Sequence, residues 1–519
     1  MRDNVGLFLS KRASLSPNLE AFVDIASGLR LSYKALNERS NQVAHMLRDR
    51  GIERGHRVAL LMLNCPAYLE AFFALAKIGA VTVPLNTRLV AAELAYILQD
   101  SGSRLLIYGE DFSETVTDLQ ARGKETTTVE DWIFVSAPGG DPNAKADFAS
   151  DYERLREQSP QDEPELAADE EDMLYIMYTS GTTGLPKGVV HTHNSAMWAC
   201  ITWSATGDVQ LYDRYLLILP LYHVGALTPV TANVYLGVTN VVQRTFDAAE
   251  VWHLIEEERI DTSLAVPAML NFMIQVPEIN QYKHERLRWI MSGAAPVPVS
   301  LIEAYTARGI PINEAYGLTE CCGPATLLTG MDVANHPGSC GKAFFHTDIR
   351  VVDEKGGNVK PEEPGEVIVR GRHVMKEYWN NPDATKKSLR GGWLYTGDIA
   401  TIDEDGFIYI QDRITDMIIS GGENVYPAEI ENVILAHPDV SDVAVIGQES
   451  KTWGESPLAV VVRGEETLNS DDIMAYCVGK LARYKLPKAV EFIDVIPRNP
   501  SGKALKRELR ERFPGHAPE

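Results

Sequence analysis

The fold of this chain is decided by the stretch Tyr178-Thr179-Ser180-Gly181-Thr182-Thr183-Gly184-Leu185-Pro186-Lys187-Gly188. An apolar strand, Met173 to Tyr178, leads into it, and Gly188-Val189-Val190 predicts a second strand directly after it. Glycines let a main chain approach an anion and turn its N–H groups toward it, hydroxyls add donors, and Lys187 adds a point charge. We therefore predict a phosphate-holding loop between two strands. It is not a Walker A loop, which needs Gly-x-x-x-x-Gly-Lys-Ser/Thr before a helix, and a flexible linker is the alternative interpretation.

The flanking sequence alternates between strand and helix patterns. Apolar strands are expected at 58–63, 80–85 and 104–108, separated by amphipathic helices at 66–78 and 91–99. The same rhythm returns after the loop, with strands at 215–219, 262–266 and 287–291 and helices at 247–259 and 300–307. This rhythm predicts an α/β fold with parallel or mixed sheets and helical crossovers. Residues 137–172, rich in Pro, Gly, Asp and Glu, read as a solvated connector.

A domain boundary is expected near Asp412. Before it, 365–370 and 406–411 read as a β-rich subdomain of the large N-terminal domain. After it come helices at 428–436 and 470–481 and strands at 443–446, 458–462 and 490–493, the pattern of a compact α+β unit. We therefore predict a large N-terminal domain, residues 1–412, and a small C-terminal domain, residues 413–519.

Composition excludes several classes of protein. The formal net charge of −23 argues against sequence-independent nucleic-acid binding, which needs a basic surface. The six cysteines are scattered without a C-x-x-C pair, so neither a disulfide framework nor a structural zinc site is expected, and a reducing, cytoplasmic setting fits best. Residues 215–243 carry no Asp, Glu, Lys or Arg, but prolines, glycines and polar residues divide them into strand-sized pieces. Buried core is favoured there over a membrane span.

Three further stretches carry chemistry, each weak alone. Tyr316-Gly317-Leu318-Thr319-Glu320 combines an aromatic face, a close-approach glycine and a carboxylate that suits magnesium, and Tyr395-Thr396-Gly397-Asp398 offers a carboxylate for ribose hydroxyls. Near the C-terminus, Pro500-Ser501-Gly502-Lys503 presents a lysine at the tip of a turn. Ordinary surface turns are the alternative interpretation of the first two.

Together, and in this order, these stretches resemble the signature motifs of the adenylate-forming superfamily: acyl-CoA synthetases, aryl-CoA ligases, peptide-synthetase adenylation domains and beetle luciferases. The resemblance covers essentially the whole chain. Within the superfamily the chain is most similar to bacterial fatty-acyl-CoA synthetases of the mycobacterial long-chain type. This closer likeness is carried by stretches such as Asn86-Thr87-Arg88-Leu89, Leu219-Pro220-Leu221-Tyr222-His223-Val224 and Leu481-Ala482-Arg483-Tyr484-Lys485-Leu486-Pro487-Lys488.

The resemblance implies two half-reactions that use ATP, Mg²⁺ and coenzyme A. A carboxylate first attacks the α-phosphate of ATP to give an acyl-adenylate, and CoA thiolate then displaces AMP after the small domain rotates. Lys503 is implied as the lysine of the first step, Thr179 and Glu320 as the magnesium ligands, and His223 as the gate of the acyl site. The nucleotide and CoA contacts implied are Thr179, Ser180, Gly181, Thr182, Thr183, Gly184, Lys187, Gly293, Ala294, Ala295, Tyr316, Gly317, Thr319, Asp398, Arg413, Gly421, Gly422 and Lys503.

One position departs from the family pattern. Thr415 stands where the superfamily usually carries Asp or Lys as the pivot of domain rotation, and a β-branched side chain is stiffer there. The leading hypothesis is a ligase for a medium- to long-chain fatty acid. An aryl or hydroxycinnamate ligase, and a catalytically idle nucleotide-binding or membrane-associated homologue, are the alternatives. The sequence leaves open the acyl chain length, a homodimer and weak peripheral membrane contact.

Overall fold

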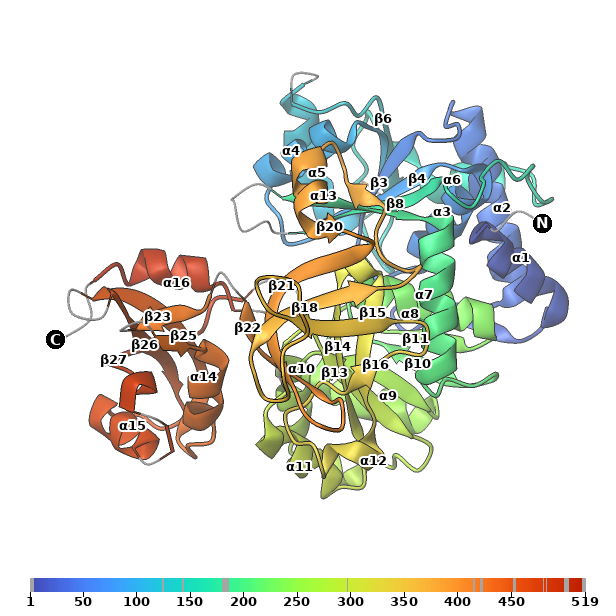
Figure 1. The fold of residues 1–519 in the computed structure, drawn as a ribbon. Helices are drawn as coiled ribbons and strands as arrows, with labels where there is room; N and C mark the ends of the chain where they lie inside the picture. The colour runs from blue at the N-terminus through green and yellow to red at the C-terminus, as the bar shows by residue number, and fades with distance from the viewer. Residues whose placement is uncertain are drawn as a thin grey trace.

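The computed structural model describes residues 4–123, 126–141, 144–179, 186–295, 297–413, 416–420, 423–450, 454–478, 480–481, 483–498 and 504–515. In this part of the chain the strands form four sheets, which Figure 1 shows as a large body and a smaller unit set to one side. The α/β class predicted from the alternating pattern is confirmed.

The eight-stranded sheet contains the loop that opened the sequence analysis. Its strand order is β19-β9-β8-β4-β3-β5-β6-β7. Strands β3, β4 and β5 are parallel, as expected for strands joined by helical crossovers. Its strands are β3 (Arg57–Leu61), β4 (Val81–Pro84), β5 (Ser103–Gly109), β6 (Asp131–Val135), β7 (Ser150–Asp151), β8 (Met173–Thr179), β9 (Lys187–Thr192) and β19 (Glu377–Tyr378).

The nine-stranded sheet has the order β16-β15-β14-β13-β12-β10-β11-β1-β2, and its centre, from β14 to β1, is parallel. Residues 215–243 fold into β10, a buried helix and β11, and no helix of the described residues is long and apolar enough to cross a membrane. Its strands are β1 (Glu20–Asp24), β2 (Arg30–Ser32), β10 (Arg214–Leu217), β11 (Thr239–Val242), β12 (Thr262–Ala265), β13 (Trp289–Gly293), β14 (Ile312–Leu318), β15 (Gly323–Leu328) and β16 (Lys342–Ala343).

Helices cover these two sheets. The helix predicted at 66–78 has those bounds, because Pro66 starts it without losing a needed N–H and Gly79 ends it with φ 73°. The helices of the large body are α1 (Gly6–Leu15), α2 (Tyr33–Asp49), α3 (Pro66–Ile78), α4 (Ala91–Ser101), α5 (Ser113–Ala121), α6 (Tyr152–Glu157), α7 (His193–Thr206), α8 (Val224–Leu236), α9 (Ala248–Glu257), α10 (Pro267–Ile274), α11 (Val299–Thr306), α12 (Gly330–Val333) and α13 (Pro382–Ser388), with single 3₁₀ turns at η1 (Glu110–Phe112), η2 (Ile279–Gln281) and η3 (Thr319–Cys321).

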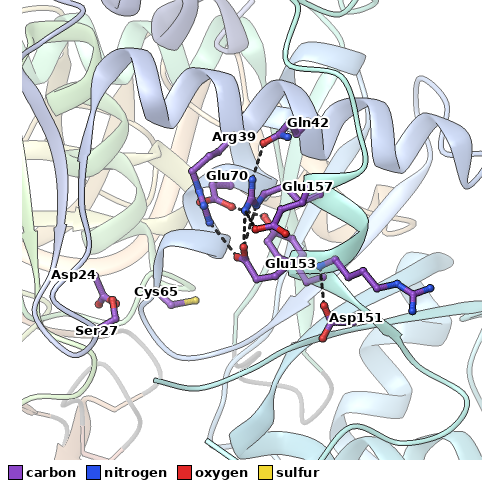
Figure 2. Close-up of polar contacts among 12 residues, drawn as sticks. Asp24, Ser27, Arg39, Gln42, Cys65, Glu70, Asp151, Glu153 and Glu157 are labelled. Atoms are coloured by element: carbon purple, nitrogen blue, oxygen red, sulfur yellow. Dashed lines mark hydrogen bonds and ion pairs between the residues drawn. The ribbon is translucent and has the colours of Figure 1, made fainter. Parts of the chain in front are cut away.

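The acidic connector is more ordered than the sequence suggested. It forms β7 and α6, and Tyr152 at the start of α6 is fully buried. The Tyr152 hydroxyl donates to Glu70 Oε2 at 2.8 Å. Arg39 pairs with both Glu70 and Glu153, which are labelled in Figure 2. Composition predicted a solvated segment because it could not reveal that a carboxylate buried on α3 needs these partners.

Two smaller sheets complete the fold. The β-rich subdomain contains β17 (Asp348–Val352), β18 (Gly365–Arg370), β20 (Leu389–Arg390), β21 (Trp393–Ile402) and β22 (Ile408–Arg413). The C-terminal unit contains β23 (Ile418–Ser420), β24 (Glu423–Val425), β25 (Val440–Ser450), β26 (Gly454–Arg463) and β27 (Ala489–Phe492), with α14 (Pro427–Leu435), α15 (Ser470–Cys477), α16 (Lys506–Arg512) and the 3₁₀ turn η4 (Arg483–Lys485).

The predicted helix at 470–481 ends early, at Cys477, because Val478 is extended with ψ 131°. The expected boundary between residues 412 and 413 falls at the end of β22, and both this boundary and the rotation of the small unit stay predictions.

Candidate active site

The stem of the phosphate loop is a β-hairpin. Strands β8 and β9 are antiparallel, and Thr179 lies opposite Lys187 at the open end. The prediction of a loop between two strands is therefore confirmed, whereas Ser180, Gly181, Thr182, Thr183 and Gly184 lie outside the described residues. The Lys187 ammonium lies 5.0 Å from the ring centroid of Tyr378 on β19.

Helix α4 anchors this stem from the side. The Tyr178 hydroxyl donates to Asp100 Oδ2 at 2.5 Å, and the Trp379 indole N–H donates to the Asp100 carbonyl at 2.9 Å. Burial, together with the Asp100 carboxylate, raises the pKa of Tyr178 above its ordinary value, so its hydroxyl stays a donor. Sequence reasoning missed Asp100, because nothing near it in the chain indicates a contact across 78 residues.

Tyr316 on strand β14, a proposed adenine contact, is joined to Asp398 on β21, a proposed ribose contact. The Tyr316 hydroxyl donates to Asp398 Oδ2 at 2.6 Å, and burial followed by the charge of Asp398 raises the pKa of Tyr316 well above its ordinary value. Asp398 on β21 lies opposite Arg413 on β22 in the antiparallel register. The structure thus brings the main chains of Asp398 and Arg413, the two predicted ribose contacts, together. It also shows that the Tyr316 hydroxyl binds the Asp398 carboxylate. The Arg413 side chain lies outside the described part of the structure.

The turn after β13 lies beside β14. Gly293 pairs with Ala315 across the two parallel strands, so the turn begins next to the residue that precedes Tyr316. Ala294 is exposed and has φ 70°, a left-handed conformation that is unusual for a residue with a side chain. Ala295 is half-buried.

Gly317 faces main chain rather than open space. A Cβ added there would lie 1.6 Å from the carbonyl oxygen of Gly323 on β15. The close approach predicted at Gly317 is therefore made at least to the main chain of β15. A contact between Gly317 and a nucleotide stays a prediction.

Glu320 lies in η3, where the two large sheets meet. Its Oε1 accepts from the Tyr378 hydroxyl at 2.8 Å, and its carbonyl accepts from Met375 N–H at 2.7 Å. The carbonyl of the preceding Thr319 lies 2.7 Å from His191 Nε2 on β9. These contacts bring Glu320 to the same side of the molecule as Lys187.

The residues present fit a magnesium ion. Magnesium is usually held by one or two carboxylates together with phosphate oxygens and water, and here Glu320 supplies a half-buried carboxylate and Thr179 a hydroxyl. Among the described residues no group of three or more His, Cys, Asp or Glu side chains forms a cage. One carboxylate and one hydroxyl suit a magnesium ion whose other ligands are substrate phosphates and water.

His223 stands apart from these contacts. It occupies the N-cap position of α8 without a side-chain capping bond, and its ring lies 4.4 Å from that of Tyr222. Burial, reinforced by the nearby Arg88 cation, lowers the pKa of His223 to about 4, so the ring is neutral at physiological pH. Within the described part of the chain its buried Nε2 has no hydrogen-bond partner.

Gly421, Gly422, Lys503 and Thr415 fall outside the described residues, and their roles remain expectations. What the structure does bring together is a lysine beside an anion-binding type of loop, a carboxylate suited to a metal, and a second carboxylate suited to ribose. Such an arrangement suits a nucleoside triphosphate. The fold and the site thus define a two-part, nucleotide-using α/β enzyme of the adenylate-forming class.

Comparisons with known proteins agree with this class. The family model described as AMP-binding enzyme matches residues 9–379, and that described as AMP-binding enzyme C-terminal domain matches residues 429–503. The chain belongs to the AMP-binding enzyme family, and the resemblance to the adenylate-forming superfamily is confirmed.

Individual relatives are similar over nearly their whole length. The chain is 46% identical over 515 residues to the long-chain-fatty-acid–CoA ligase FadD13 of Mycobacterium tuberculosis, covering 99% of each chain, and 39% identical over 511 residues to a feruloyl-CoA synthase of Amycolatopsis sp, covering 98% of this chain and 99% of the relative. Among solved structures, a Mycobacterium tuberculosis fatty acyl CoA synthetase matches with 45% identity and a TM-score of 0.80, covering 98% of both chains. The o-succinylbenzoate coenzyme A synthetase of Bacillus subtilis in complex with ATP and magnesium ion matches with 31% identity and a TM-score of 0.85, covering 97% of this chain and 99% of the other.

Proposed function

We propose that this chain is an AMP-forming acid–thiol ligase that activates a medium- to long-chain fatty acid with ATP and transfers the acyl group to coenzyme A. The observation that carries the proposal is that two carboxylates, each held by a tyrosine hydroxyl, lie near the C-terminal end of β14. Asp398 is held by Tyr316 of β14, and Glu320 of the adjoining η3 is held by Tyr378 beside Lys187. The 46% identity to a long-chain-fatty-acid–CoA ligase supports the choice of substrate.

The reaction has two displacements in one site. An oxygen of the acid attacks the α-phosphorus of ATP, forming an acyl–phosphate bond and releasing pyrophosphate. The sulfur of CoA then attacks the acyl carbonyl, forming a thioester and releasing AMP. Both steps depend mainly on positioning and on charge directed at the reacting oxygens, so no protein nucleophile is required.

The residue roles proposed are those that the family resemblance implies, and the charges and donors of these side chains suit them. Lys187 and the glycine loop bind the β- and γ-phosphates, and Asp398 with Arg413 binds the ribose. Thr179 and Glu320 hold magnesium, which neutralises phosphate charge when bound. Lys503 contacts the acid and the α-phosphate in the first step.

The remaining nucleotide contacts are proposed as a set: Ser180, Gly181, Thr182, Thr183, Gly184, Gly293, Ala294, Ala295, Tyr316, Gly317 and Thr319.

The second step is proposed to use the small domain, residues 413–519. Its rotation about Thr415 replaces Lys503 by Gly421 and Gly422, which line the path of the CoA thiol, while His223 gates the acyl site. Because proline would fix φ and remove an N–H at the pivot, Thr415→Pro should stop thioester formation and spare acyl-adenylate formation. Equal loss of both partial reactions, measured separately with and without CoA, would refute the pivot.

A cytoplasmic setting is part of the proposal. All six cysteines are free thiols, as suits a reducing compartment. A homodimer and weak membrane contact stay open.

The test is pyrophosphate release over a panel of acids. Alkanoic acids of increasing length should be turned over with ATP, and CoA should convert the adenylate to thioester. Preference for substituted cinnamates would instead favour an aryl-CoA ligase, an alternative supported by the 39% identity to a feruloyl-CoA synthase. If no acid of either class supports pyrophosphate release, the ligase proposal is contradicted and the catalytically idle homologue is favoured.

A further inference from the structure

Tyr378 connects two residues of the proposed active site that are far apart in sequence. It lies on β19, a short strand that pairs with β9 through Tyr378 opposite Val189. Its hydroxyl donates to Glu320 Oε1 at 2.8 Å, and its ring lies 5.0 Å from the Lys187 ammonium. The side chain is 6% exposed, so both contacts are made by a ring that is almost completely surrounded.

We propose that Tyr378 is a positioning residue for the magnesium carboxylate: its hydroxyl fixes one oxygen of Glu320 so that the other faces the cation, and its ring keeps Lys187 at the end of the phosphate loop. This inference rests on the proposed function, because it assigns Glu320 and Lys187 to metal and phosphate.

The main chain on both sides of Tyr378 is held by hydrogen bonds. Met375 N–H donates to the Glu320 carbonyl, and Trp379 N–H donates to the Gly188 carbonyl at 2.7 Å. The segment that carries Tyr378 is therefore tied to η3 at one end and to the loop stem at the other. A hydroxyl mounted on such a segment has little freedom relative to Glu320 or Lys187.

The chemistry of the contact explains why a tyrosine is needed. The terminal torsion of a glutamate side chain has a broad minimum, so an isolated carboxylate rotates easily. A hydroxyl donating to one oxygen removes that freedom, and among the described residues Glu320 Oε2 accepts no hydrogen bond. Oε2 is thus the oxygen available to a cation. A phenylalanine would keep the ring near Lys187 and lose only the hydroxyl, which separates the two contacts experimentally.

The contact also explains the position of Lys187. An ammonium near an aromatic face is attracted by the ring quadrupole, whereas a lysine on an open strand end samples many rotamers. The ring of Tyr378 therefore favours the rotamers that keep the charge beside the loop. Trp379, the next residue, packs its Cβ near Gly188, which leaves the ring of Tyr378 on the Lys187 side.

The first experiment measures metal binding rather than turnover. Free Mn²⁺ is titrated by electron paramagnetic resonance against enzyme saturated with α,β-methylene-ATP, an analogue that cannot be cleaved at the reacting bond. We expect Tyr378→Phe to weaken Mn²⁺ binding about 10-fold, as is typical when a residue that orients a metal ligand is lost. Binding of the analogue without metal should change by less than about 2-fold, because Lys187 keeps its aromatic neighbour.

A matched control is available in the buried cluster of Figure 2. Tyr152 also donates its hydroxyl to a carboxylate, Glu70 Oε2 at 2.8 Å, and it directly follows β7, which lies at the opposite edge of the eight-stranded sheet from β19. Tyr152→Phe should lower the thermal unfolding midpoint and leave Mn²⁺ affinity unchanged. Unchanged Mn²⁺ affinity in Tyr378→Phe as well, or equal weakening in both variants, would overturn the inference.

A double-mutant cycle separates this inference from the proposed function. If Tyr378 acts through Glu320, Tyr378→Phe should weaken Mn²⁺ binding much less in the Glu320→Gln background than in wild type. The effects of the two substitutions on Mn²⁺ affinity should therefore not add. Additive effects would contradict the positioning role. If Glu320→Gln weakens Mn²⁺ binding and Tyr378→Phe does not, only the inference fails; if wild-type enzyme binds neither Mn²⁺ nor the analogue, the proposed function fails with it.

Discussion

Glu314 makes the stability of this protein depend on pH in an unusual direction. It lies on β14, is 6% exposed, and its Oε1 has no hydrogen-bond partner in the described part of the chain. Ser292 lies opposite it on β13, and the buried Ser292 hydroxyl likewise has no partner there. Burial raises the pKa of Glu314 from 4.5 to about 8, because the charged carboxylate would lose its hydration there. Burial, with a contribution from Glu314, raises the pKa of the nearby Cys340 thiol to about 12, so that thiol is neutral.

The sign follows from where the proton is held. Between pH 4.5 and about 8 the folded chain keeps the Glu314 proton and the unfolded chain has lost it. The contribution to stability is complete below pH 4.5 and is lost as the pH rises through about 8. Each pKa unit corresponds to about 1.4 kcal/mol, so the wild-type protein should lose about 3 kcal/mol of unfolding free energy on this account between pH 5 and pH 8. Glu314→Gln replaces the group by a neutral one of similar size and should remove this loss.

The assay is urea unfolding of both proteins at intervals from pH 5 to pH 8. The difference between the two free energies should change by about 3 kcal/mol across the range, in favour of Glu314→Gln at high pH. Glu303→Gln, on the exposed face of α11, is the control and should run parallel to wild type. Parallel curves for Glu314→Gln and wild type would show that this carboxyl ionises in the folded protein as it does in water.

Three further outcomes test the site and its frame. Tyr316→Phe removes a donor to the Asp398 carboxylate. Because this hydrogen bond is made to a charged group, its loss should raise the apparent KM for ATP about 10-fold. An unchanged KM in steady-state kinetics would contradict the proposed contact between Asp398 and the nucleotide. Gly317→Ala should lower the free energy of unfolding by about 3 kcal/mol or more, because the new Cβ would meet main chain at 1.6 Å, whereas Gly225→Ala, with its nearest atom at 3.7 Å, should be mild; equal midpoints in denaturant would mean that β14 and β15 separate easily. Lys503→Ala should slow acyl-adenylate formation by about 10²-fold or more in single-turnover assays, as for loss of a positioned charge, and near-normal rates would remove this lysine from the first step.

The regular elements could be predicted because their signals are local. Helix α3 has the bounds expected from its apolar spacing, with Pro66 at the start and Gly79 in the left-handed conformation after the end. The hairpin stem of β8 and β9 follows from two apolar runs around a glycine-rich loop. The parallel order of β3, β4 and β5 follows from the helices between them.

The partners of the site residues could not be predicted because they come from pairing at long range. Strand β19 is only Glu377–Tyr378, yet it adds to β9 and delivers Tyr378 to Glu320. Two residues carry no periodic signal, and a tyrosine in such a stretch looks like any half-buried aromatic residue. Asp100 and Glu314 were missed for the same reason: each lies inside a regular element whose pattern explains it without a site. The one signal in the sequence was a charged residue among apolar neighbours, as at Glu314 in β14, which indicates a buried polar side chain.

The weak motifs lie near one another because η3 is at the contact between the two large sheets. Strand β14 of the nine-stranded sheet leads into η3, and His191 on β9 of the eight-stranded sheet reaches the Thr319 carbonyl. Burial lowers the pKa of His191 to about 4, so the ring is neutral at physiological pH.

A carbonyl can only accept, so the His191 proton must be on Nε2, and Nδ1 must accept from the Ser195 hydroxyl at 3.0 Å. Because a neutral ring needs no counter-ion, this link between the sheets does not depend on whether phosphate is present. If Lys187 and Glu320 bind phosphate and magnesium as proposed, the nucleotide meets two charges that the fold already holds near each other through Tyr378.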